Sequence, residues 1–127
     1  MAQFNVDIVQ KPIRTAAILT TSYVAGTVLD VSKYSQVSLL VKFTIGSLTS
    51  AQIKVELSSD GTTYFQETFQ SISGATSTDS IGEHSISATG NYIINIPVLS
   101  RYMKVSVKGT GTVTSSSVTV DALLGVQ

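Results

Sequence analysis

The sequence predicts an all-β protein that folds as a single antiparallel β-sandwich or jelly roll of about eight to ten short strands. The first reason is alternation: residues 37–45, VSLLVKFTI, are apolar at every odd position, which places those side chains on one face of a pleated strand. The second reason is recurrence, because similar stretches return along the chain with turn residues about every eight to twelve positions. No stretch of comparable length has a helical period, so we expect sheets throughout.

The N-terminal part predicts a strand on each side of a proline. Residues 4–9 alternate apolar and polar side chains and predict a first strand. Pro12 has no N–H donor, so we expect it to interrupt strand pairing before a second strand at residues 13–21. The sequence therefore predicts an N-terminal strand or arm at residues 1–12 and a β-sandwich domain at residues 13–127.

An Asp-Gly pair marks the clearest turn. It follows an alternating strand at residues 51–57, and Asp60 and Gly61 favour a hairpin because Gly accepts positive φ and Asp caps local amides. The return strand is expected at residues 62–69. Residues 70–82 are rich in Ser, Thr and Gly and nearly free of bulky side chains. We expect them to form the longest loop, a candidate for partner contact.

The remaining strands are predicted by the same alternation between short turns. Pro97 indicates that the strand containing it lies at a sheet edge or ends there. These further strands are expected at residues 27–31, 83–88, 92–98, 101–108 and 115–124.

The chain carries little charge, and its charges balance. Eight Lys and Arg residues oppose eight Asp and Glu residues, and only 13% of the residues are charged, about half the usual share. A nucleic-acid-binding protein concentrates Lys and Arg on one face, whereas the six lysines and two arginines here are scattered along the sequence. We therefore expect no nucleic-acid partner. Weak repulsion between lightly charged copies permits self-association into a homo-oligomer, although a β domain with a Ser- and Thr-rich exterior has the same composition.

The sequence has no recognisable secretion or membrane signal, so we expect synthesis and folding in the cytoplasm. The chain has no cysteine, which excludes disulfides and thiolate metal sites and fits folding in a reducing compartment. Its first residues lack the basic region and long apolar core of a secretion signal. No apolar run approaches the roughly 20 residues that span a bilayer, so we expect no membrane partner.

No group of residues suggests catalysis. His84 is the only imidazole, and its acidic neighbour in sequence is expected on the opposite face of a strand, so the two should not act together. Glu56 and Glu67 could meet across the hairpin, as a glycosidase pair requires. On an outward face we expect them instead to meet solvent or lysines 54 and 104. We predict that the protein is not an enzyme and uses no cofactor or metal ion.

Two groups of side chains are candidates for contact with a ligand or partner. Exposed tyrosines stack on sugars and are common at interfaces, although tyrosines at the rim of a core, with hydroxyls in solvent, are the alternative interpretation. Turn and loop residues form the second group. The candidate contact residues are Tyr64, Tyr102, Asp60, Ser77, Thr78 and Asp79.

Two stretches resemble known protein families. Residues 53–64, IKVELSSDGTTY, followed by residues 99–105, LSRYMKV, resemble the core of discoidin-type jelly rolls. The same pair, preceded by residues 28–34, VLDVSKY, is similar to small β-sandwich proteins of tailed bacteriophage particles, and this similarity extends over residues 27–120.

The phage resemblance implies a structural protein located in the virion after synthesis in the host cytoplasm. It would be a capsid decoration or auxiliary protein, or a small head, neck or tail protein, that forms a homo-oligomer and binds other virion proteins. The discoidin resemblance implies the alternative, a carbohydrate-binding module that attaches to a surface glycan through loops at one end of the sandwich. In both cases the shared residues build the fold, so neither resemblance assigns a ligand-binding residue.

Overall fold

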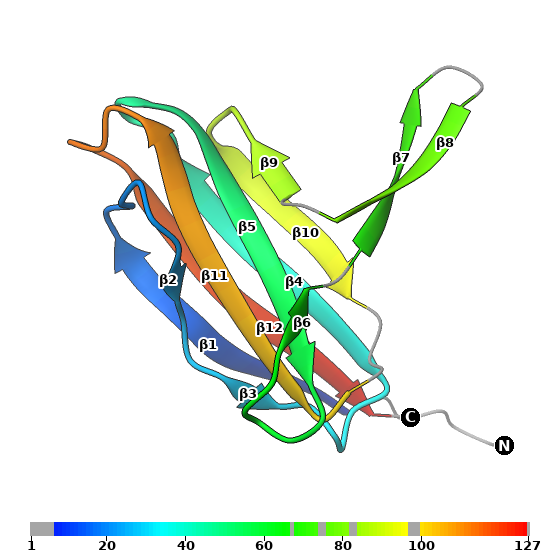
Figure 1. The fold of residues 1–127 in the computed structure, drawn as a ribbon. Coiled ribbons are helices and arrows are strands. Elements are labelled where there is room, and N and C mark those ends of the chain that lie inside the picture. The colour runs from blue at the N-terminus through cyan, green and yellow to red at the C-terminus, as the bar shows by residue number, and fades with distance from the viewer. Residues whose placement is uncertain (1–6, 67, 74–75, 82–83, 97–99, 127) are drawn as a thin grey trace, which may run out of the picture.

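The computed structural model describes residues 7–66, 68–73, 76–81, 84–96 and 100–126, and side chains within 8–66, 84–96 and 100–125. Ten of the twelve described strands form two antiparallel sheets packed face to face, the described residues contain no helix, and the predicted all-β sandwich is confirmed (Figure 1). The described residues contain twelve strands rather than about eight to ten, because three of the twelve are only two residues long.

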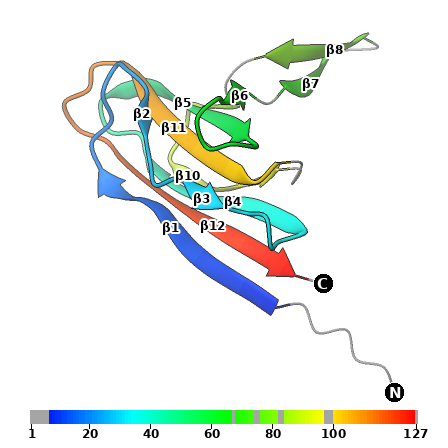
Figure 2. The same ribbon diagram turned by 60° about the horizontal axis from the view of Figure 1, so that its bottom comes forward.

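The first sheet has four long strands (Figure 2). Its order is β1 (Asp7–Ala17), β12 (Ser117–Val126), β4 (Gln36–Thr44) and β10 (Gly90–Ile96). β4 pairs with β12 on one side and with β10 on the other. β1 and β10 are therefore the two edges of this sheet.

The second sheet is built around two strands that pair along almost their whole length, β5 and β11. Shorter strands flank them: β2 and β3 pair with β11, and β6 and β9 pair with β5. The members of this sheet are β2 (Val24–Ala25), β3 (Leu29–Asp30), β5 (Leu48–Ser58), β6 (Phe65–Gln66), β9 (His84–Ile86) and β11 (Tyr102–Gly111).

The core lies between the two sheets and is made of the apolar positions of the alternating patterns. On β4, the four odd positions from Val37 to Phe43 are buried, as alternation predicts. Burying one such side chain contributes about 1.5–3 kcal/mol. The same holds on the other long strands, where the buried residues include Ile53, Val55, Met103, Val105, Val107, Val118, Val120, Ala122 and Leu124.

Ser47, in the turn from β4 to β5, bonds to the loop from β11 to β12, and both of these connections run from one sheet to the other. Its hydroxyl donates to the carbonyl of Thr112 at 2.6 Å and accepts from the backbone N–H of Ser115 at 3.0 Å. Beside it, Gly46 has a φ of 53°, and a Cβ there would lie 1.8 Å from the carbonyl oxygen of Ser115. Only glycine fits, so the β4–β5 turn and the β11–β12 loop stay in contact.

The expectation that Pro12 interrupts strand pairing is wrong. β1 pairs with β12 on both sides of Pro12, although the register shifts between Pro12 and Arg14. An edge strand tolerates proline because the missing N–H can face away from the ladder. The strand thus continues past residue 12, and residues 7–12 of the segment expected as an N-terminal strand or arm pair as a strand within their own chain. Residues 1–6 lie outside the described residues.

The segment expected as a long loop, residues 70–82, contains most of a β-hairpin instead. β7 (Thr68–Ser73) and β8 (Thr76–Ile81) pair antiparallel and form a separate two-stranded sheet, which projects from the sandwich in both ribbon views (Figures 1 and 2). The expected return strand at residues 62–69 is correspondingly short, since β6 covers only two residues. The candidate contact residues of this segment lie on β8, and their side chains lie outside the described ones: Ser77, Thr78 and Asp79.

Candidate interaction surfaces

The outer face of the second sheet gathers tyrosine and lysine side chains. Along β5 and β11, polar residues alternate with core residues, and the register places Glu56 opposite Lys104, and Gln52 opposite Lys108. The face is completed by two tyrosines from outside these strands. We call it the tyrosine–lysine face; it comprises Tyr23, Lys54, Glu56, Tyr64, Lys104 and Lys108.

The lysines of this face lie over aromatic rings. The ammonium nitrogens of Lys54 and Lys108 are 4.5 and 4.7 Å from the centre of the Tyr23 ring, and that of Lys104 is 4.2 Å from the centre of the Tyr64 ring. Each contact places a cation against the negative face of a ring, worth about 0.5–1 kcal/mol at an exposed site. The lysine ammonium groups of this face are thus already in contact with tyrosine rings of the same chain.

Glu56 lies between two of these lysines. Its Oε1 is 3.5 Å from Lys54 Nζ and 3.9 Å from Lys104 Nζ, which confirms the expected contact of this carboxylate with lysines. The predicted alternative partner, Glu67, lies outside the described residues. The arrangement is an ordinary cross-strand ion pair network on a sheet surface.

Tyr102 and Tyr64 lie at the same end of the second sheet, but their surroundings differ. The Tyr64 ring carries the Lys104 ammonium, as described above. Tyr102 pairs with Ser58 in the ladder and packs against the turn after β5: a Cβ on Gly61 would lie 3.3 Å from the Tyr102 ring. The guanidinium carbon of Arg101 is 5.3 Å from the centre of the same ring. Tyr102 therefore supports the turn as well as lining the surface.

Asp60 organises that turn. Its Oδ1 accepts the backbone N–H groups of Thr62 and Thr63, both at 2.8 Å, and the hydroxyl of Ser58 at 3.0 Å. The bonds from Thr63 and then Thr62 lower the pKa of the Asp60 carboxyl, because they stabilise its charged form. Gly61 has a φ of 78°, as the Asp-Gly signal predicts. The described contacts of Asp60 are those of a turn residue.

A second carboxylate, Asp30 at the end of β3, binds the residue that precedes β11 and is not among the predicted contact residues. Asp30 Oδ1 accepts the hydroxyl of Ser32 at 2.6 Å, and Asp30 Oδ2 accepts Arg101 Nε at 3.2 Å. These contacts, the Ser32 hydroxyl first, lower the pKa of Asp30 to about 2. The local signal was the Asp-x-Ser spacing of an Asx turn, but nothing local predicts Arg101 as the partner.

The outer face of the first sheet has apolar side chains on all four of its strands, although Lys42 and Asp121 also lie on it. Ile8 on β1 is 65% exposed and Ile93 on β10 is 60% exposed, while Leu40 on β4 and Leu123 on β12 are half-buried between them. We call these four residues the apolar face. Ile93 lies directly opposite Leu40 in the ladder.

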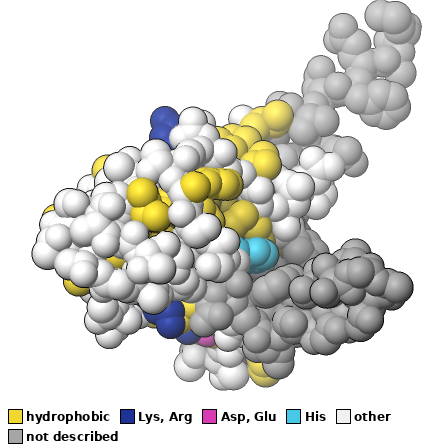
Figure 3. All heavy atoms as spheres, turned by 90° about the horizontal axis from the view of Figure 1, so that it is seen from above, with side chains coloured by type: hydrophobic (Ala, Val, Ile, Leu, Met, Phe, Trp, Pro, Cys, Tyr) yellow, Lys and Arg dark blue, Asp and Glu magenta, His cyan; other side chains and the backbone are white. Residues whose placement is uncertain are grey.

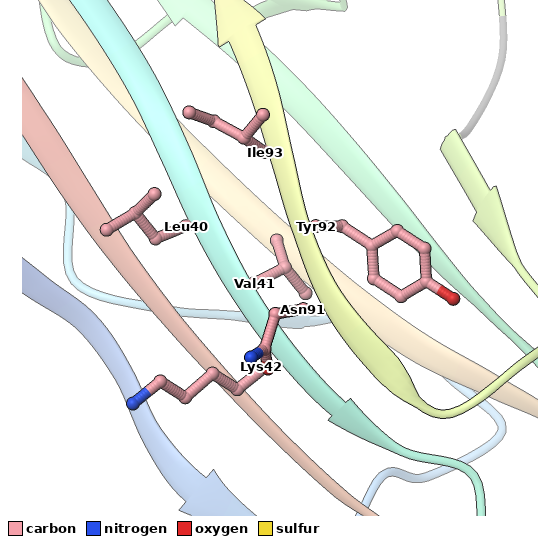
Figure 4. A pocket seen from close by; sticks show the side chains of 6 residues that line it. All are labelled: Leu40, Val41, Lys42, Asn91, Tyr92 and Ile93. Carbon is pink, nitrogen blue, oxygen red and sulfur yellow. The ribbon is translucent and has the colours of Figure 1, made fainter.

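Two shallow hollows mark this face. The larger, of about 280 Å³, follows the β4–β10 ladder; Figure 4 shows Leu40 and Ile93 on the adjacent strands, with the Tyr92 ring on the other side of β10. The smaller, of about 120 Å³, lies toward β1 and is lined by Ile8, Gln36, Ser38, Leu123 and Gly125. Both are surface depressions rather than enclosed ligand cavities.

Within the described part of the chain, no three His, Asp, Glu or Cys side chains are placed to hold one metal ion. His84 lies on β9, half-buried at the border of the second sheet, opposite Ile53 in the ladder. The described residues contain no helix that is long and apolar enough to cross a membrane.

No family model matches the sequence, and no curated protein matches it. The fold is similar to the crystal structure of the SPBc2 prophage-derived protein YomS, with a TM-score of 0.55. The two chains are 20% identical, and the similarity covers 98% of each. The sandwich is therefore a fold that this chain shares with YomS along nearly its whole length.

Proposed function

We propose that this protein is a structural component of a tailed bacteriophage particle: a capsid decoration or auxiliary protein, or a small head, neck or tail protein. In this role it self-associates and binds other virion proteins. The observation that carries the proposal is the similarity of fold to a prophage-derived protein over 98% of both chains. The resemblance of residues 27–120 to small β-sandwich virion proteins supports the same role.

The surface supports assembly. In the part of Figure 3 that is not grey, most of the surface is backbone or side chains that are neither hydrophobic nor charged, with apolar side chains gathered near the middle and few charged ones. The chain has zero formal net charge, so copies repel one another weakly. The apolar face adds exposed Ile8 and Ile93, which contribute favourable area when another protein covers them.

A carbohydrate-binding module is the second candidate, favoured by the gathering of Tyr23 and Tyr64 on one face with Tyr102 at its end. Such rings can stack on sugars. Here, however, a sugar would compete with the lysine ammonium groups over Tyr23 and Tyr64, and Gly61 packs against the Tyr102 ring. For this reason the virion role comes first.

Purified particles test the proposal. When the phage or lysogen that encodes the chain is induced, we expect the chain to co-sediment with particles in a density gradient and immunogold labelling to place it at one recurrent position. A host cytoplasmic protein of similar abundance is the control for carry-over.

Absence of the chain from particles at every stage of assembly would contradict the virion role. Saturable binding to a glycan array that is lost in Tyr64→Ala, with an unchanged unfolding midpoint, would then favour the carbohydrate-binding module.

A further inference from the structure

The two edges of the first sheet differ in how they are protected. An edge strand presents unpaired N–H and C=O groups that can pair with another strand, and proteins block this with charges, proline and bulges. β1 has all three: Lys11 and Arg14, Pro12, and register shifts on both sides of Arg14. This edge is built to resist pairing.

β10 has none of these protections. Its seven residues, GNYIINI, include no charged residue and no proline, and they pair with β4 without a register shift. Among the described strands, β4 alone pairs with β10, so the other edge of β10 carries no strand there. A long, regular, uncharged edge of this kind is a template for strand addition.

We infer that β10 pairs antiparallel with β10 of a second copy of this chain, about a twofold axis at Ile93, and so joins the two four-stranded sheets into one. The inference deepens the proposed function and rests on its self-association. The occupant is a second copy because the strand is complementary to itself in this register.

The register makes that complementarity explicit. A twofold axis at Ile93 sets Ile93 opposite its counterpart, Tyr92 opposite Ile94, and Asn91 opposite Asn95. Apolar and aromatic–β-branched pairs stabilise neighbouring strands, and no charge faces a like charge along β10. Asn95 Oδ1 accepts the Ser38 hydroxyl at 2.7 Å, which leaves the Asn95 amide N–H groups to donate to Asn91 of the other copy.

Pairing also extends the apolar face. Ile93, 60% exposed in the single chain, would contact its counterpart and continue the row that begins at Leu40. A seven-residue strand pair buries less than the roughly 800 Å² per partner of a standard interface, so we expect a dimer that dissociates on dilution.

Ile93→Lys tests the inference, with Ile8→Lys as the matched control. Both changes place a lysine at an exposed isoleucine of the same sheet, but only the first brings two like charges face to face in the proposed pair. By light scattering over a concentration series, we expect the wild-type chain to approach twice its 13.4 kDa mass. Ile93→Lys should weaken dimerisation at least about tenfold, and Ile8→Lys should leave it unchanged.

Mixing Ile93→Lys with Ile93→Glu should restore a dimer, because opposite charges then meet. Hydrogen exchange should show β10 amides whose protection rises with protein concentration.

A dimer that survives Ile93→Lys overturns the inference. Loss of the dimer in both lysine variants also overturns it, because that result indicates pairing through the apolar face. A wild-type chain that stays monomeric at every concentration also overturns it, even if another part of the same chain protects the β10 amides from exchange. None of these results bears on co-sedimentation with particles, so the two proposals fail separately.

Discussion

The two outer faces of the sandwich differ in how far their own chain completes them. On the tyrosine–lysine face, lysines lie over tyrosine rings and Glu56 contacts two of them, so the charged groups have partners within the chain. On the apolar face, Ile8 and Ile93 remain mostly exposed. We therefore expect the apolar face to gain more free energy than the tyrosine–lysine face when another protein covers it, because burial of apolar area gives association most of its free energy.

The largest effect is a difference in stability between substitutions on the two sides of β4. Leu39 and Leu40 are adjacent in sequence but lie on opposite sides of this strand. Leu39 is fully buried in the core, and Leu39→Ala should lower the free energy of unfolding by about 2–5 kcal/mol. Leu40 is half-buried on the apolar face, and Leu40→Ala should cost less than about 1 kcal/mol in the dilute protein. Urea denaturation measures both. Equal losses would show that Leu40 belongs to the core and would remove the distinction between the faces.

An intermediate effect is expected at the turn beside the tyrosine–lysine face. Gly61→Ala places a Cβ at a φ of 78° and 3.3 Å from the Tyr102 ring, which should cost about 1–2 kcal/mol of stability. Gly61→Asn should cost less, because Asn tolerates the left-handed conformation better. Thermal unfolding compares the two variants. An alanine variant as stable as the wild type would contradict both the cost of the left-handed conformation and the close approach to the Tyr102 ring.

The smallest effect concerns the pKa of Asp30, which shows whether an exposed carboxylate is held mainly by its local contact with Ser32 or by the distant Arg101. Its folded pKa of about 2 lies below the ordinary 3.8, so any stability it contributes is present above about pH 4 and is lost as pH falls toward 2. Ser32→Ala should raise this pKa more than Arg101→Gln does, because the Ser32 hydroxyl is the larger cause. NMR titration of the Asp30 carboxyl carbon measures both shifts. A larger response to Arg101→Gln would make the long-range ion pair the dominant contact.

Much of the fold follows from local pattern, and the failures have physical reasons. The alternation at residues 37–45 predicts which face of β4 is buried because side-chain direction repeats every two residues. Residues 70–82 are expected to form a loop because they are nearly free of bulky side chains, yet most of them pair in the β7–β8 hairpin, since β-propensity depends strongly on context. Pro12 was expected to interrupt a strand because its edge position is not visible in sequence.

The candidate sites follow the same division. The Asp-Gly signal correctly places a turn at Asp60, because turn chemistry is local. Its packing against Tyr102 and the pairing of Asp30 with Arg101, 71 residues apart, could not be predicted in this way. Such contacts depend on which strands become neighbours.

Alternation and turn residues determine that this chain forms strands, and they determine which side chains enter the core, since both are set by the dihedral angles and solvation of a few adjacent residues. Tertiary structure alone decides that β1 pairs with β12 from the opposite end of the chain. It also decides which strands lie at the edges: among the described strands of the first sheet, β1 and β10 are the edges, and β10 is the one without charge or proline. Pairing is chosen by complementarity between distant segments and by the free-energy cost of closing the loops between them, and neither quantity is contained in a local pattern.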